Sequence, residues 1–141
     1  ISSNNSNGAT FAKVGDVITI SVSASENIQT PTVTIAGNAA AIASGSNGER
    51  VYTATYTMQS SDNTGVIPFT VDFSDMANNA GTQVTAVAND SDGGVTFDKQ
   101  APSFTTVTMS SNNSTSTLAI VNDVITINIK ILIISLNSIN P

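Results

Sequence analysis

The sequence predicts an all-β protein, and three observations support this prediction. Apolar and polar residues alternate along several short stretches, most clearly over residues 16–25, where Ile18 and Ile20 fall on one face. Gly, Pro, Asn and Asp cluster between these stretches, as expected where a chain reverses direction. No stretch of adequate length repeats its apolar residues at the helical period of 3.6 residues. Short strands at this spacing indicate an immunoglobulin-like antiparallel β-sandwich.

The expected strands follow one another with short polar connections. Residues 1–15 are expected to hold the end of a first strand and then an Asn/Ser/Gly loop, and a turn at Gly15 leads into the strand over residues 16–25. Pro31 opens the next strand, in which Val33 and Ile35 face inward. The remaining strands are expected at residues 39–43, 51–58, 66–73, 82–88 and 95–98.

Two of these stretches carry specific signals. Asn47-Gly48 is the strongest signal for a tight hairpin in the chain, and residues 51–58 are expected to form its return strand. Tyr52 and Tyr56 share the apolar face of that strand and are therefore expected in the core rather than on a sugar-stacking surface. Pro68 cannot donate a backbone hydrogen bond, so the strand over residues 66–73 is expected to lie at an edge or to contain a bulge.

An internal repeat defines the domain organisation. The pentapeptide Asp-Val-Ile-Thr-Ile at residues 16–20 returns at residues 123–127, and Ser-Ser-Asn-Asn-Ser at residues 2–6 returns at residues 110–114. The period is that of a whole small domain and is too long for a solenoid unit. The sequence therefore predicts a module over residues 1–102, followed by the truncated start of a second repeat over residues 103–141, with Pro102 in the linker.

Composition restricts the range of functions. The net charge is −6 with only 4 basic residues, which gives no footprint for nucleic acid or anionic lipid. The chain has no Cys and no His, which excludes disulfides, thiol nucleophiles and Ser-His-Asp triads. Its apolar run near Ile131 is too short for membrane insertion. We therefore expect no enzymatic activity.

Three stretches resemble the bacterial immunoglobulin-like (Big-type) repeats of large cell-surface and secreted proteins. Residues 13–20 resemble the entry into the second strand of that family. Residues 75–81 resemble its Asp-x-Ala-Gly-Asn loop, with Asn78 in the place of Gly, and residues 97–102 resemble its Asp-x-Thr-Ala-Pro junction, with Gln100 in the place of Thr. The resemblance implies the sandwich fold and a role as a spacer, adhesin stalk or accessory module.

The tail of the chain predicts a donor strand. Its isoleucines occupy successive positions on one face of a strand and form the candidate interface: Ile125, Ile127, Ile129, Ile131 and Ile133. Such a face can be covered by adding the strand to an open sheet edge, in the same module or in a neighbouring subunit. A vacancy is expected in the first module, because no residues equivalent to Ser103–Thr108 precede Ile1. The alternative is a truncated repeat with no such partner.

Oxygen-bearing side chains near the turns form a candidate calcium site. Ca²⁺ takes six to eight oxygen ligands from carboxylates, amides and carbonyls. The same residues are also common turn formers, so a solvated turn is the competing interpretation. The candidate ligands are Asp72, Asp75, Asn78, Asp90, Asp92 and Asp98.

The sequence therefore predicts a structural or adhesive module of a bacterial extracellular or cell-surface protein. Its expected partners are neighbouring repeats or identical subunits, joined by β-strand addition into a fibre, and a surface glycan or protein. An accessory carbohydrate-binding module of a secreted enzyme is the alternative, although the chain has no Trp and only 5% aromatic residues.

Overall fold

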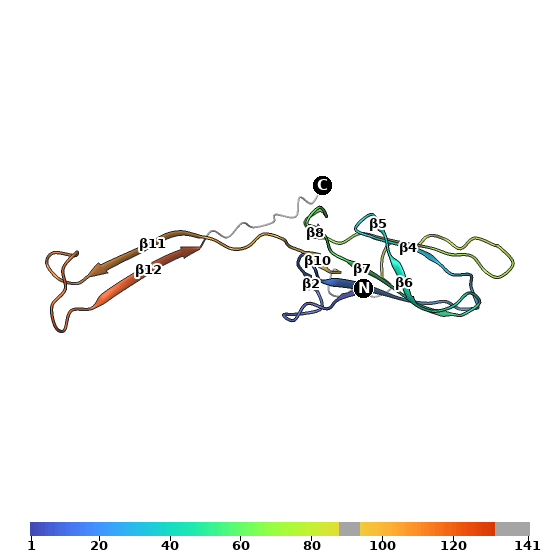
Figure 1. The fold of residues 1–141 in the computed structure, drawn as a ribbon, viewed down its shortest axis with the longest axis horizontal. Coiled ribbons are helices and arrows are strands. Elements are labelled where there is room, and N and C mark those ends of the chain that lie inside the picture. Colours follow the sequence, from blue (N-terminus) through green and yellow to red (C-terminus); the bar gives the residue numbers. More distant parts are fainter. Residues whose placement is uncertain (88–93, 132–141) are drawn as a thin grey trace. The chain divides into compact units, whose positions relative to one another are not determined.

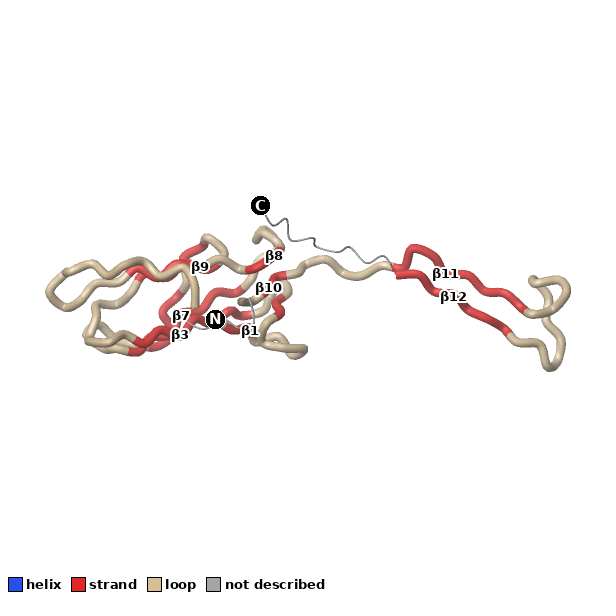
Figure 2. Tube along the Cα trace, turned by 180° about the vertical axis from the view of Figure 1, so that it is seen from behind, coloured by secondary structure: helices blue, strands red, loops and turns tan. Residues whose placement is uncertain are grey.

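The computed structural model describes residues 1–87 and 94–131, and these residues form strands and loops without any helix (Figures 1 and 2). The predicted all-β class is confirmed. The chain divides into two compact units, Ile1–Lys99 and Gln100–Pro141. The boundary predicted from the sequence, between residues 102 and 103, lies close to this division.

The first unit is built from small sheets that together form two layers. One layer is a four-stranded sheet with the order β1-β3-β7-β6, from Ser2–Ser3, Val17–Ser23, Val51–Thr57 and Ala41–Ser44. The other layer has a three-stranded sheet with the order β5-β4-β9, from Asn38–Ala39, Thr32–Ile35 and Phe69–Asp72. A third sheet has the order β2-β10-β8, from Phe11–Ala12, Thr96–Phe97 and Gly65–Val66.

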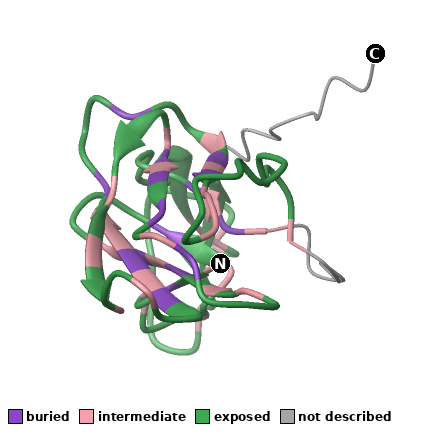
Figure 3. Cartoon of the chain, turned by 90° about the vertical axis from the view of Figure 1, so that its right-hand side faces the viewer, coloured by how far each residue is buried: buried purple, intermediate pink, exposed green. Residues whose placement is uncertain are grey.

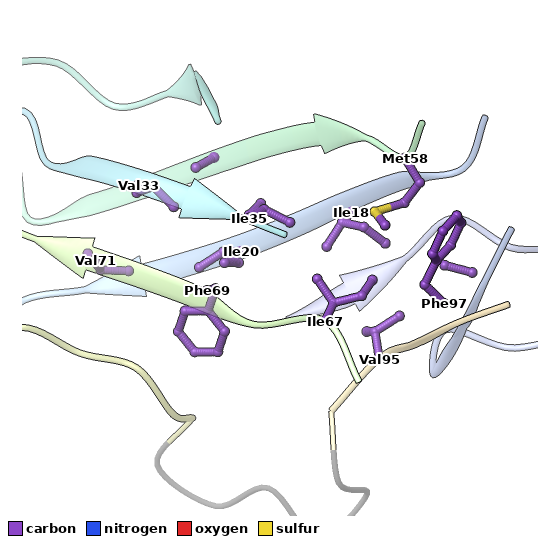
Figure 4. Close-up of a cluster of buried hydrophobic side chains, with 12 residues drawn as sticks. Ile18, Ile20, Val33, Ile35, Met58, Ile67, Phe69, Val71, Val95 and Phe97 are labelled. Carbon is purple, nitrogen blue, oxygen red and sulfur yellow. The ribbon is translucent and has the colours of Figure 1, made fainter. Parts of the chain in front are cut away.

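The core lies between the inward faces of these strands. The alternation that predicts β3 from the sequence appears directly in its burial, with Ile18 and Ile20 buried and Val17 and Thr19 half-buried. Tyr52 in β7 is fully buried, which confirms its expected core position. Figure 4 shows the central cluster, and the buried positions of the described residues, purple in Figure 3, all belong to this unit.

The stretch over residues 66–73 differs from the single strand that the sequence predicts. It is divided into β8 and β9, which belong to different sheets. The break falls at Ile67 and Pro68, and proline cannot donate to a strand ladder. Ile67 N–H bonds to the Val95 carbonyl (2.9 Å) and the Pro68 carbonyl accepts from Ala36 N–H (2.8 Å), so each side of the break joins a different sheet.

Two further elements differ from the expected pattern. The pairing of β2 with β10 is parallel, whereas the other strand pairs are antiparallel. The strand expected over residues 82–88 is represented by a single bridge, in which Val84 exchanges hydrogen bonds of 2.9 and 3.0 Å with Val71. Ala88 lies outside the described residues.

A turn is present at Asn47-Gly48, where Glu49 N–H bonds to the Ser46 carbonyl (3.0 Å), but it lies within the longer connection over residues 45–50 between the antiparallel strands β6 and β7, so the tight two-residue hairpin that the sequence predicts is not formed. Gly48 adopts φ +88°, and Gly45, at the start of the same connection, adopts φ +102°. Both values lie in the region that favours glycine.

The second unit contains one antiparallel hairpin of β11 (Phe104–Ser111) and β12 (Ile125–Ile131). The register pairs Val107 with Ile129 and Met109 with Ile127, and a bulge lies between Phe104 and Thr106. All residues of β12 are exposed.

Candidate functional site

A hydrogen-bonded group, here called the first aspartate clamp, ties the loop before β3 to β1. The Asp16 carboxylate accepts hydrogen bonds from the Asn5 side-chain amide (2.6 Å) and from Lys13 N–H (2.8 Å). Asn4 pairs with Val17 twice, because its Oδ1 accepts from Val17 N–H (2.8 Å) and its N–H donates to the Val17 carbonyl (3.1 Å). The clamp therefore fixes where β3 begins.

The second copy of the repeated motif forms the same bonds, here called the second aspartate clamp. Asp123 accepts from the Asn113 amide (2.8 Å) and from Ile120 N–H (2.8 Å). Asn112 pairs with Val124 through bonds of 3.0 and 3.1 Å. Residues 15 and 122 both adopt positive φ, at +90° for Gly15 and +77° for Asn122. The repeated sequence therefore has the same local conformation in both units.

Both clamps favour the charged form of their carboxylate. Burial of Asp16 favours the neutral form, but the bonds from Lys13 N–H and Asn5 and the charge of Lys13 outweigh it and lower the pKa of Asp16. The bond from Asn113, then that from Ile120 N–H, lowers the pKa of Asp123 against a smaller opposing effect of burial. Each clamp is therefore expected to weaken when its aspartate is protonated.

A groove opens beside β3. Residues Ile20–Ser23 pair with β7 on one side, and among the described residues no strand pairs with their other side. The groove has a volume of about 640 Å³ and is lined mainly by apolar side chains. The residues that line it include Ile20, Val22, Phe69, Val71, Val84 and Ala86. Figure 4 labels Ile20, Phe69 and Val71.

Residues 125–131 of the predicted donor strand form β12, which pairs with β11 of the same unit, and strand donation stays a prediction. Because residues opposite each other on paired strands lie on the same face, β11 and β12 together form one apolar face and one polar face. The apolar face of the hairpin comprises Phe104, Val107, Met109, Ile125, Ile127, Ile129 and Ile131, each at least 48% exposed. Ile133 lies outside the described residues.

The candidate calcium ligands are distributed over several elements. Asp75 and Asn78 share one loop, where the Asp75 carboxylate accepts three hydrogen bonds, from Ala77 N–H, Asn79 N–H and the Asn79 amide (2.7 to 2.8 Å). The side-chain and backbone bonds from Asn79 lower the pKa of Asp75 most, burial opposes them with a smaller effect, and the bond from Ala77 N–H adds a further lowering. Asn78 adopts φ +70°, in the left-handed region that Asn tolerates better than most residues with a Cβ.

The other candidate ligands lie elsewhere. Asp72 ends β9 and accepts from the Gln83 amide (2.8 Å), and Asp98 follows β10, where its N–H bonds to the Ala12 carbonyl (2.8 Å). Asp90 and Asp92 lie outside the described residues. Within residues 1–87 and 94–131, no cluster of three or more Asp and Glu residues is arranged to hold a metal ion. Calcium binding remains a prediction.

One buried polar cluster has no counterpart in the sequence prediction. Asp62, only 6% exposed, accepts hydrogen bonds from Gln59 N–H (2.7 Å), the Asn38 amide (3.2 Å) and the Tyr56 hydroxyl (3.2 Å). Lys99 Nζ binds the carbonyls of Ser60 and Asp62 at 2.9 and 2.8 Å. Burial, then the hydrogen bond and charge of Asp62, raises the pKa of Tyr56 against a smaller effect of Asn38. In the sequence, Asp62 is indistinguishable from a turn former in a polar loop.

Comparison with known proteins finds no matching family model, no similar curated protein and no similar solved structure. In the part of the chain that the structure describes, no helix is long and apolar enough to cross a membrane. The clamps, the groove and the apolar hairpin face are therefore the basis for assigning a function.

Proposed function

We propose that this chain is a structural or adhesive repeat module of a bacterial extracellular or cell-surface protein. In this role it assembles with neighbouring repeats or identical subunits through the β11–β12 hairpin. The observation that carries the proposal is the exposed apolar face of that hairpin.

The exposed face supports assembly because its side chains have the pattern of half a sandwich core. The corresponding side chains of β3 in the first unit, Ile18 and Ile20, are buried. Their counterparts Ile125 and Ile127 are 48% and 59% exposed. Full burial of one isoleucine contributes roughly 1.5–3 kcal/mol, so covering several of them provides a driving force for association.

The two aspartate clamps support the tandem-repeat part of the proposal. Each clamp joins an Asn-Asn pair to an Asp-Val pair through bonds of closely similar length. The clamp is local and specifies how a strand begins, which is the kind of feature that a repeated module carries from copy to copy. A role without catalysis also accords with a sequence that has neither His nor Cys.

Light scattering and negative-stain electron microscopy of the full chain test the proposal. We expect oligomers or filaments whose amount rises with protein concentration. A chain that stays monomeric at all concentrations, and whose grids show single particles only, contradicts assembly. A glycan array run on the same sample separates this role from carbohydrate binding, for which selective retention of one sugar class is expected.

A further inference from the structure

The tripeptide Ser-Asn-Gly occurs twice in the first unit, at residues 6–8 and at residues 46–48. Asparagine followed by glycine can lose ammonia without an enzyme, because the glycine nitrogen can attack the side-chain carbonyl carbon and no Cβ shields it. Both asparagines, Asn7 and Asn47, are exposed. The local sequence therefore predicts the same reactivity at both positions, and any difference between them has to come from the fold.

Both reacting groups of the second tripeptide are held by a neighbouring segment. Asn47 Oδ1 accepts a hydrogen bond from Thr30 N–H (3.2 Å), and Gly48 N–H donates to the Ile28 carbonyl (2.9 Å). The attacking nitrogen and the amide that it would attack are therefore each fixed by a separate bond. Ring closure at Asn47 requires that both bonds open, and each hydrogen bond that has to open lowers the reactive fraction.

The first tripeptide is held less firmly. Gly8 N–H donates to the Asn5 carbonyl within the same loop, over a longer distance of 3.2 Å. The Asn7 side chain forms no hydrogen bond with any residue that the structure describes, while the Asn7 main-chain N–H donates to Asn5 Oδ1 (2.9 Å). A single local hydrogen bond therefore restrains the reacting groups at Asn7, whereas two bonds to another segment restrain those at Asn47.

We propose that Asn7 is a site of spontaneous deamidation in the folded chain and that the fold protects Asn47. The Gly8 nitrogen bonds to Asn7 Cγ, the bond from Cγ to the side-chain nitrogen breaks, and ammonia leaves with the proton of the Gly8 N–H. Water then opens the succinimide ring at either of its carbonyl carbons and gives aspartate or isoaspartate. The net change is the gain of water and the loss of ammonia, with no oxidation or reduction.

The modification acts on the first aspartate clamp through Asn5. This residue accepts hydrogen bonds from the N–H groups of Asn7 and Gly8, and its side-chain amide donates to Asp16 (2.6 Å). Isoaspartate inserts a methylene group into the main chain between positions 7 and 8 and adds a negative charge, so it changes the turn that positions Asn5. Deamidation therefore loosens the clamp as the protein ages.

The second unit has the same turn without the reactive pair. Asn113 Oδ1 accepts from Thr115 N–H (3.1 Å), as Asn5 Oδ1 accepts from Asn7 N–H, so Thr115 occupies the position of Asn7. Threonine has no side-chain amide to lose. Asn7→Thr is therefore a matched control, because the second unit shows that the turn accepts threonine.

Ageing of the full chain in mildly alkaline buffer, followed by peptide mapping with mass spectrometry, tests the proposal. We expect deamidation at residue 7 to be at least about fivefold faster than at residue 47 in the folded chain, because fewer hydrogen bonds have to open. In concentrated urea the two rates should agree within about twofold, since both sites then differ little in their surroundings. Equal rates in the folded chain, faster conversion at residue 47, or no conversion at residue 7 while the urea sample reacts overturns the proposal.

Urea denaturation of aged samples tests the link to the clamp. The unmodified chain should unfold at a lower urea concentration once residue 7 has been converted, whereas the Asn7→Thr chain, aged for the same time, should keep its midpoint. An unchanged midpoint after conversion at residue 7, or an equal loss in both chains, contradicts the link. Neither measurement depends on association of the chain, so both are independent of the proposed assembly.

Discussion

The side-chain amide of Asn5 donates a hydrogen bond of 2.6 Å to the carboxylate of Asp16, and this bond joins the loop after β1 to the start of β3. The same carboxylate also accepts from Lys13 N–H (2.8 Å). Two donors therefore converge on one oxygen of an ionised carboxylate, Oδ2, and the negative charge strengthens both bonds. The argument applies equally to Asn113 and Asp123.

Replacing Asp16 with Asn should destabilise the first unit. Both bonds end on Oδ2, so the amide oxygen of Asn can still accept them, but they lose the negative charge that makes them strong. Hydrogen bonds to charged groups contribute about 1.5–3 kcal/mol and those between neutral groups about 0.5–1.5, and Asp16 is only half-buried, so we expect a loss of roughly 1 kcal/mol. Urea denaturation measures this, with Ser6→Ala as an exposed control in the same loop. A loss no larger than that of Ser6→Ala would show that the clamp does not stabilise the fold.

Acid should weaken the protein through the same groups. The pKa values of Asp16 and Asp75 are lowered in the folded chain. Each carboxylate therefore contributes stability that is present above the unfolded pKa of about 3.9 and is lost as the pH falls through the folded value. The free energy of unfolding should decline below about pH 4, and the difference between the Asp16→Asn variant and the unmodified chain should shrink over that range. Urea titrations between pH 7 and about pH 2.5 test this, and a pH-independent difference contradicts it.

Gly45 should be much less tolerant of substitution than Gly37. Both adopt positive φ, at +102° and +78°, so alanine at either position costs about 1 kcal/mol of backbone strain. A Cβ at Gly45 would also overlap the Tyr52 ring and the Val51 carbonyl, whereas a Cβ at Gly37 would meet nothing within 4 Å. Gly45→Ala should therefore lower the melting temperature clearly further than Gly37→Ala. Equal shifts would show that the Tyr52 side chain moves away at little cost.

The calcium hypothesis can be tested at Asp75. If Ca²⁺ binds the folded chain, its addition at about 100 times the dissociation constant should stabilise the fold by about 2.7 kcal/mol relative to EDTA. The Asp75→Asn variant should lose that increment, and Asp98→Asn shows whether the ligand set extends to β10. The same melting temperature in Ca²⁺ and in EDTA would show that Asp75 stabilises the turn without binding calcium.

Much of the fold can be predicted from the sequence because its strands have one buried face. The alternation over Ile18 and Ile20, and over Tyr52 and Ala54, predicts both the strands and their inward faces. Ile28 is a counterexample: it lies where the alternation breaks, yet it is buried and bridges to Asp75. An isolated bridge leaves no periodic pattern that could have predicted it.

The candidate sites were less predictable, because they depend on contacts between distant segments. The groove is defined by Val22 on one strand and Ala86 on another segment, and neither residue alone signals a cavity. The buried position of Asp62 becomes apparent only from the hydrogen bonds that the Asn38 and Tyr56 side chains donate to it. The division of residues 66–73 could be foreseen at Pro68, but the assignment of its halves to two sheets could not, since it depends on partners at Val95 and Ala36.

The central claim is that the apolar face of the β11–β12 hairpin is an assembly surface, and one sedimentation-velocity experiment tests it most directly. Ile129→Lys places a charge on that face, and Asn128→Lys changes the net charge equally on the opposite face. We predict that the unmodified chain and Asn128→Lys associate as concentration rises, while Ile129→Lys remains monomeric. Identical sedimentation of all three proteins would contradict the claim.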